Sequence, residues 1–142
     1  MKKGFTLIEL LAVIIILAIV ALIATPIILD VVEDARKSAA KSEASMILNG
    51  VQTYCAAAEA KKQLNPDADV VDCTTTISAE DVKEMANLGS ATVSSVTPET
   101  DGTYSLYVKS NGYLIGIYKG VIPTSYTKTA TDVPATAPTT AQ

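Results

Sequence analysis

The chain lacks the residues on which many enzymes and metal sites depend. It has no histidine, the commonest general base and metal ligand in proteins. Its two cysteines, Cys55 and Cys73, are too few for a four-cysteine zinc site. The sequence also has no phosphate-binding glycine loop and no Ser-centred elbow motif. We therefore predict that this chain is not an enzyme and that it holds no cofactor or metal.

Aromatic residues and positive charge are also scarce. Of the 142 residues, 49% are hydrophobic, but only 5% are aromatic and none is tryptophan. The formal net charge is −4, whereas nucleic-acid-binding domains usually present a basic face. Direct binding of nucleic acid is therefore not predicted. The length allows one small folded domain at most.

The most prominent feature that is present is a long apolar run at residues 5–29. It is interrupted only by Thr6, Glu9, Thr25 and Pro26. As a helix it would extend about 37 Å at ~1.5 Å per residue, enough to cross a ~30 Å hydrocarbon core. A single membrane-spanning helix is predicted. A secretory signal peptide fits less well, because the run is too long for its apolar region and no A-x-A cleavage site follows.

Glu9 is the one carboxylate in this apolar run. A charged group inside a bilayer costs ~2.5–3.5 kcal/mol on insertion scales and usually has a partner. No lysine or arginine occurs between Lys3 and Arg36. Cleavage between Gly4 and Phe5 would create a positive α-amine about one helical turn away. If a neighbouring copy were shifted by four residues, about 6 Å, its amine would lie level with the carboxylate.

The first residues resemble the class III signal for methylation and cleavage that type IV prepilins carry. Lys2, Lys3 and Gly4 form a short basic leader, the hydrophobic Phe5 follows, and Glu9 stands four positions further on. Each element of the family pattern is present. The sequence is therefore identified, by resemblance, as a type IV pilin precursor.

This resemblance implies a processing pathway. Residues 1–4 would be a leader peptide that is recognised through Lys2 and Lys3. A prepilin peptidase would cleave between Gly4 and Phe5, and Phe5 would then be N-methylated.

The resemblance covers residues 1–36 and also includes Pro26, which lies where major pilins commonly carry a helix-kinking proline. Low aromatic content, a small head and the lack of a C-terminal cysteine pair resemble a Gram-positive, clostridial-like major pilin. The implied function is a structural subunit of an extracellular pilus that supports adhesion, motility or aggregation. The subunit would span the cell membrane once before assembly and lie in a surface filament afterwards.

The implied partners are further copies of the chain, the prepilin peptidase, an inner-membrane platform protein, an assembly ATPase and the membrane itself. Two alternatives stay open. One is a pseudopilin of a type II secretion or competence DNA-uptake system. The other is a single-pass, membrane-anchored binding module that never polymerises.

The helix is predicted to continue beyond the apolar run. Residues 30–63 contain no proline and carry apolar side chains at the helical period of 3.6. A kink is expected near Pro26, because proline lacks a backbone donor and crowds the carbonyl four residues earlier. The charged side chains of residues 30–43 permit two interpretations, a solvated face or ion pairs between subunits.

The next segment, residues 64–122, predicts a small globular head. A polar loop leads to a short helix at 79–88, for which Ser78 is the predicted N-cap. Apolar and polar residues then alternate, which predicts strands at about 91–96, 103–109 and 113–119.

Three strands alone bury little surface, so this sheet must pack on the long helix. The predicted fold class is α+β: a long N-terminal helix, hydrophobic and then amphipathic, packed on a small three-stranded antiparallel sheet. The pilin resemblance implies the same arrangement. Five tyrosines of this region are predicted to pack across the strands rather than to serve adhesion or electron transfer: Tyr104, Tyr107, Tyr113, Tyr118 and Tyr126.

Cys55 and Cys73 are candidates for a disulfide. The head would lie outside the membrane, where disulfides persist. A bridge would tie the end of the long helix to the following loop and would stabilise the fold by ~3 kcal/mol. Two free thiols are the alternative. Such a bridge departs from the resemblance, because many Gram-negative pilins bridge their C-terminal region instead.

The last segment, residues 123–142, is rich in threonine, alanine and proline. This composition predicts a flexible tail. Its hydroxyl groups are also candidate acceptors for O-linked sugar, with a plain flexible end as the alternative.

Overall fold

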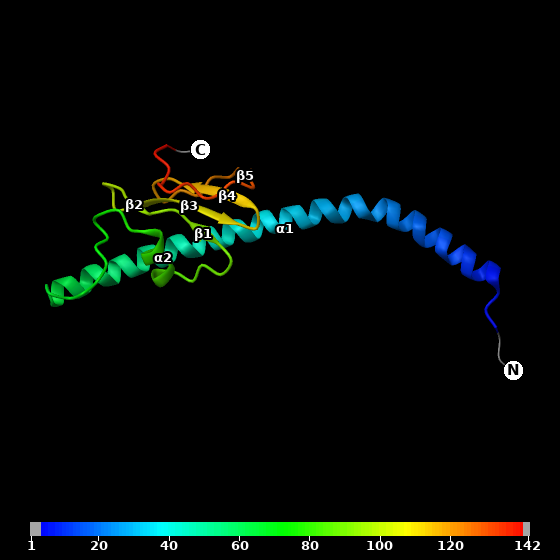
Figure 1. Ribbon diagram of the computed structural model, residues 1–142, viewed down its shortest axis with the longest axis horizontal. Coiled ribbons are helices and arrows are strands. Elements are labelled where there is room, and N and C mark those ends of the chain that lie inside the picture. The colour runs from blue at the N-terminus through cyan, green and yellow to red at the C-terminus, as the bar shows by residue number, and fades with distance from the viewer. Residues whose placement is uncertain (1–3, 141–142) are drawn as a thin grey trace. The chain divides into compact units, whose positions relative to one another are not determined.

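The computed structural model describes residues 4–140 (Figure 1). The chain divides into two compact units, with the boundary between Arg36 and Lys37. The elements, in chain order, are α1 (Leu7–Leu64), α2 (Ala79–Met85), β1 (Thr92–Val93), β2 (Thr97–Pro98), β3 (Tyr104–Ser110), β4 (Tyr113–Ile117) and β5 (Thr127–Lys128).

The first unit is the N-terminal part of α1. Its large hydrophobic side chains, from Leu7 to Val32, are exposed. Within residues 4–140, α1 is the one helix that is long and apolar enough to cross a membrane. The sequence prediction of a membrane-length apolar helix is confirmed.

Pro26 lies inside α1, and the helix continues through it. The proline nitrogen has no hydrogen, so the carbonyl of Leu22 lacks its usual intrahelical donor. One residue earlier, the Thr25 hydroxyl donates a hydrogen bond of 2.7 Å to the carbonyl of Ala21. The hydroxyl group of Thr25 is thereby satisfied within the helix.

The second unit packs one stripe of α1 against an antiparallel sheet. Small and branched apolar residues recur along this stripe at the helical period, and all are buried. From the sheet, Leu106, Val108, Ile115 and Ile117 are fully buried in the same core. The helical stripe consists of Ala40, Ala44, Ile47, Leu48, Val51, Cys55 and Ala58.

The sheet has the order β1-β3-β4-β5, and β2 also pairs with β3. All pairs are antiparallel, with Val108 opposite Ile115 in the central β3–β4 hairpin. Asn111 and Gly112 form its turn with φ values of 51° and 83°. Positive φ at both central residues is the geometry of the tight hairpin turn that Asn-Gly favours.

The predicted α+β fold class is confirmed, but the expected three-stranded sheet has five short strands. The expected strand 91–96 is shortened to β1, and β2 forms just beyond its expected end, with a β-bulge between the two. At the bulge, the Tyr107 N–H donates to the Ser94 side-chain oxygen at 2.8 Å instead of to a backbone carbonyl. Val96 pairs with Ile77 rather than with β3.

The helix α2 begins as predicted, with Ser78 as its N-cap accepting from the Asp81 N–H at 3.2 Å. It ends at Met85 rather than at residue 88, because Ala86 adopts an extended conformation. Ala86 is buried, and a Cβ atom added at Gly50 would lie 2.8 Å from its side chain. α1 and α2 therefore approach each other closely at Gly50 and Ala86, where α2 ends.

The tail contributes structure where a flexible segment was expected. It forms β5 against β4, and the ring of Tyr126 packs edge-on against Tyr113 with centroids 5.9 Å apart. The Tyr126 hydroxyl donates to the carbonyl of Lys37 at 3.0 Å. Further along, the Ser95 hydroxyl donates to the carbonyl of Ala135 at 2.8 Å. The described part of the tail thus lies against the head.

Candidate processing and assembly site

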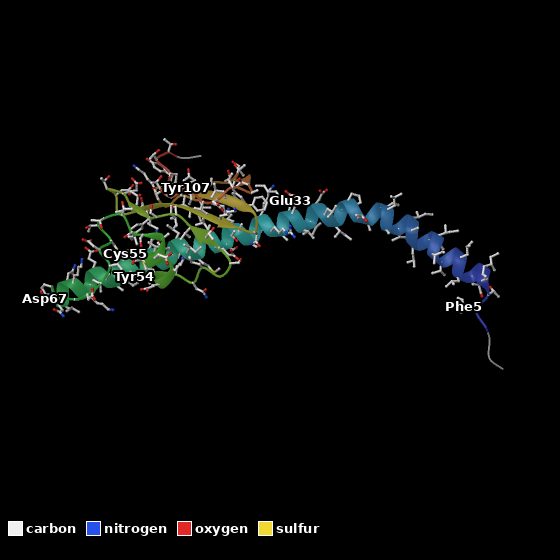
Figure 2. All side chains as sticks on the ribbon, viewed as in Figure 1. Phe5, Glu33, Tyr54, Cys55, Asp67 and Tyr107 are labelled. Atoms are coloured by element: carbon white, nitrogen blue, oxygen red, sulfur yellow. A yellow bond between two sulfur atoms is a disulfide. The ribbon has the colours of Figure 1, made fainter. Side chains whose placement is uncertain are left out.

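The peptide bond between Gly4 and Phe5 lies in a short non-helical segment before α1. Phe5 is 81% exposed, and a Cβ atom added at Gly4 would meet nothing within 4 Å. Figure 2 shows Phe5 at the start of the helix. A protease needs such an exposed, irregular segment in order to bind the chain. Lys2 and Lys3, the predicted recognition residues, lie outside the described residues.

Thr6 and Glu9 cap the start of α1 reciprocally. The Thr6 N–H and the Thr6 hydroxyl both donate to Glu9 Oε2, at 2.9 Å and 2.8 Å. In return, the Glu9 N–H donates to Thr6 Oγ1 at 3.4 Å. This is a capping box, in which two backbone donors that a helix start leaves without partners are satisfied.

The cap corrects the expectation that Glu9 has no partner within its own chain. That expectation considered only lysine and arginine as partners. The spacing Thr6-Leu7-Ile8-Glu9 fits the S/T-x-x-E signature of a capping box, so the sequence does contain the signal. Both bonds from Thr6 end on Oε2, so another donor can approach Oε1 without displacing Thr6.

The surface around this cap is apolar. Leu7 and Ile8 are 83% and 73% exposed, and large exposed hydrophobic residues continue along the first unit. An apolar surface of this extent marks a contact with lipid or with other proteins. The carboxylate of Glu9 is therefore placed where its surroundings become water-poor once the helix is covered.

Comparison with protein families gives one match at this segment. Residues 1–25 match the family model described as the prokaryotic N-terminal methylation motif. The match supports a type IV pilin-like prepilin. No curated protein and no solved structure matches the chain. The matched motif does not indicate the bacterial group, so the clostridial-like character is not shown.

In this N-terminal segment, the structure brings Gly4, Phe5 and Glu9 within about one helical turn of one another. Pro26 belongs to the same unit but lies about 26 Å further along α1 at ~1.5 Å per residue. The two predicted assembly residues, Glu9 and Pro26, thus lie at different levels of the same helix.

The predicted disulfide pair lies in the second unit. Cys55 and Cys73 are joined, with a Cα–Cα distance of 5.7 Å. Figure 2 labels Cys55 on the head part of α1. The bond ties the helix to the loop that follows it, and Lys62 lies 3.9 Å from Asp72 next to this connection. The disulfide therefore fixes this loop against the end of α1.

Several ionisable groups of the head have shifted pKa values with structural causes. Hydrogen bonds from Thr74 lower the pKa of Asp72, and hydrogen bonds from Thr103 lower the pKa of Asp101. Burial raises the pKa of the Tyr104 phenol, and the charge of Glu59 adds to this effect. Across residues 4–140, no group of histidine, cysteine, aspartate and glutamate side chains is suited to hold a metal ion.

Proposed function

We propose that this chain is the structural subunit of an extracellular type IV pilus. A prepilin peptidase removes residues 1–4, and the mature subunits assemble from the membrane into a filament. That filament serves adhesion, motility or aggregation. The supporting observation is the position of Glu9, one turn after the exposed Gly4–Phe5 bond and within an apolar helix whose surface is uncovered.

The helix of the first unit serves two states in this proposal. Before assembly, lipid covers its apolar side chains. After assembly, the same side chains pack against helices of other copies, so association depends on packing and on polar contacts rather than on removal from water. A helix with identical neighbours on several sides must be apolar around its circumference, as the exposed residues of this unit are.

Glu9 sets the register in this proposal. Cleavage turns the Phe5 nitrogen into a positive amine, and N-methylation preserves that charge. The amine of one copy approaches Glu9 of its neighbour while Thr6 of the same chain continues to hold Oε2. In a water-poor filament core an unpaired carboxylate is costly. The register between copies that pairs the two charges is therefore favoured over other registers.

The partners of this proposal follow from its steps. The prepilin peptidase acts at Gly4 and Phe5. A platform protein in the inner membrane and an assembly ATPase extract the helix from the lipid. Extraction requires work, because the whole apolar surface of the helix leaves the bilayer. Subunits wait in the membrane and end in a filament on the cell surface.

Intact-mass analysis of fibres sheared from cells tests the proposal. The expected mass is that of the chain without residues 1–4 and with one added methyl group. The full-chain mass in the membrane fraction, with no subunit in the sheared fraction, would instead indicate an anchored binding module. A processed and methylated chain that is absent from sheared material would indicate a pseudopilin.

A further inference from the structure

The chain contains the dipeptide Asn-Gly twice, at Asn49–Gly50 and at Asn111–Gly112. In this dipeptide the asparagine carboxamide and the next backbone nitrogen can react with each other, because glycine has no Cβ atom to hinder their approach. The structure places the two copies in opposite environments. One lies inside the long helix α1, and the other forms the tip of the β3–β4 hairpin (Figure 1).

Asn111 and Gly112 are accessible in the hairpin turn. Both residues are exposed, and both have positive φ values, 51° and 83°. The ladder between β3 and β4 ends at the pair Ser110–Tyr113, so the Gly112 N–H lies outside this ladder. No hydrogen bond of the ladder therefore has to break before the Gly112 nitrogen loses its proton.

Asn49 is protected by the helix. α1 continues through Asn49 and Gly50, so the regular helical pattern pairs the Gly50 N–H with the carbonyl four residues earlier. The Asn49 carbonyl accepts from the Thr53 hydroxyl at 2.8 Å. Gly50 also packs against α2, where an added Cβ atom would lie 2.8 Å from the Ala86 side chain. A reaction at Asn49 requires local opening of this packed helix.

The two other asparagines of the chain precede residues that hinder the reaction. Asn65 precedes Pro66, whose nitrogen carries no proton to lose. Asn87 precedes Leu88, whose branched side chain crowds the approach, and its Oδ1 accepts from the Gly89 N–H at 3.2 Å. Asn111 is therefore the asparagine that the fold leaves most open to reaction.

We propose that Asn111 is a modification site, at which asparagine converts spontaneously to aspartate and isoaspartate with water as the second reactant. The Gly112 nitrogen loses its proton to the solvent and forms a bond to the side-chain carbonyl carbon of Asn111. The side-chain nitrogen takes up a proton and leaves as ammonia, so that a cyclic imide remains. Water then opens the imide at either of its carbonyls. The reaction needs no filament, so it goes beyond the proposed function.

The product disturbs a network that joins the hairpin to α1. Asn111 Nδ2 donates to Ser110 Oγ at 3.0 Å, and the buried Ser110 hydroxyl donates to Glu43 Oε2. A hydroxyl has one proton, and Ser110 gives it to Glu43. A carboxylate at position 111 would therefore receive no donor from Ser110 and would lie one hydroxyl group away from Glu43. Repulsion between the two negative charges would loosen the turn from the helix.

Isoaspartate would disturb the turn further, because its main chain runs through the side chain and is one carbon longer. A tight turn with two central residues at positive φ does not accommodate this extra atom. The tail is attached to the same turn, since the Thr129 N–H donates to the Gly112 carbonyl at 3.0 Å. Conversion of Asn111 therefore weakens both the contact of the hairpin with α1 and the attachment of the tail.

Peptide mapping by mass spectrometry tests the site in the full chain in detergent micelles. During incubation in neutral buffer, conversion adds one mass unit to the tryptic peptide that contains the reacting asparagine. We expect Asn111 to react at least about tenfold faster than Asn49, equivalent to ~1.4 kcal/mol of local helix opening. A sample digested without incubation corrects for conversion during handling.

The same mapping in denaturant is the matched control, because it removes both the turn and the helix while keeping the two dipeptides. Asn49 and Asn111 should then react at similar rates. Equal rates in the folded chain would contradict the proposal. An Asn111 that reacts only in denaturant would contradict it as well, because the turn would then protect the residue.

Asn111→Asp tests the consequence of the conversion. Asparagine and aspartate both tolerate positive φ, so the substitution changes the charge and keeps the turn. We expect thermal scans in micelles to show a Tm about 4–8 °C below that of the parent. In a chain that carries Glu43→Gln, the same substitution should cause a smaller decrease. An unchanged Tm, or a decrease that Glu43→Gln does not reduce, would contradict the repulsion between positions 43 and 111.

Discussion

Thr6 caps the same carboxylate that the mature N-terminus is proposed to meet. The two hydrogen bonds from Thr6 to Glu9 Oε2 are made within the chain, before any neighbour is present. The carboxylate is therefore oriented in advance, and little side-chain freedom remains to be lost when a partner amine arrives. The capping contribution and the charge contribution of Glu9 are separable by substitution.

Glu9→Gln separates the two contributions. Glutamine also occupies the third helical position of a capping box, so the helix start is expected to survive. The negative charge is lost, however, and with it the attraction to the Phe5 amine of a neighbour. We expect normal cleavage after Gly4 but a large loss of sheared fibre, measured by quantitative immunoblotting of sheared and membrane fractions. Fibres at the parental level would show that the charge does not direct assembly.

Thr6→Val removes the hydroxyl and keeps the shape of the side chain. An N-cap substitution of this kind costs about 1 kcal/mol of helix stability. We expect fraying of the first turn of α1, measured by hydrogen exchange of the amides near Glu9 in detergent micelles. Thr6→Ser is the matched control and should keep the protection. Equal protection in Thr6→Val and the parent would contradict a role for this cap.

Cys55 and Cys73 offer a stability prediction for the head. Their bond closes a loop with a sequence separation of 18 residues, for which the chain-entropy model gives about 3 kcal/mol. Replacing both by alanine should therefore lower the Tm by about 12–24 °C, because ~1 kcal/mol corresponds to ~4–8 °C in a domain of this size. Thermal scans of the parent with and without reductant provide the control. Identical unfolding temperatures for the parent, the reduced parent and the double alanine variant would show that the disulfide does not stabilise the head.

Gly50 and Ala86 offer a test of the contact between α1 and α2. A Cβ atom at residue 50 would lie 2.8 Å from the Ala86 side chain, so Gly50→Ala forces the two helices apart. Overpacking costs about 1–3 kcal/mol, against a gain of ~1 kcal/mol in helix propensity. A net loss of about 1 kcal/mol is expected in denaturant unfolding. The pair Gly50→Ala with Ala86→Gly should be more stable than Gly50→Ala alone.

The features predicted correctly from sequence depend on local patterns. The long helix follows from the apolar run and from the helical period of the residues after it, and the β3–β4 turn follows from Asn111 and Gly112. The N-cap Ser78 follows from its position before two acidic residues. In each case the deciding residues are neighbours in the chain.

The structure differs from the sequence prediction where contacts between residues far apart in the chain determine the local conformation. The bulge at Ser94 depends on a hydrogen bond from Tyr107, and Val96 leaves the sheet because Ile77 pairs with it. The tail is ordered by contacts such as that of Tyr126 with Tyr113. Its composition alone predicts flexibility, because pairing partners far along the chain are not visible in composition.

Asp72 and Asp101 give the head a predictable response to acid. Hydrogen bonds from Thr74 and Thr103 lower both pKa values below the ordinary value of 3.8, so these carboxylates favour the folded state when ionised. Their contribution is complete above pH 3.8 and is lost as the pH falls through the lowered folded-state values. Thr74→Val with Thr103→Val should therefore unfold more easily than the parent at neutral pH. The difference should disappear in strong acid, where both carboxyl groups are protonated in the folded and unfolded states.

Urea titrations at a series of pH values measure the difference in stability between the variant and the parent. A difference that stays constant down to the lowest pH would assign the effect of the threonines to packing instead.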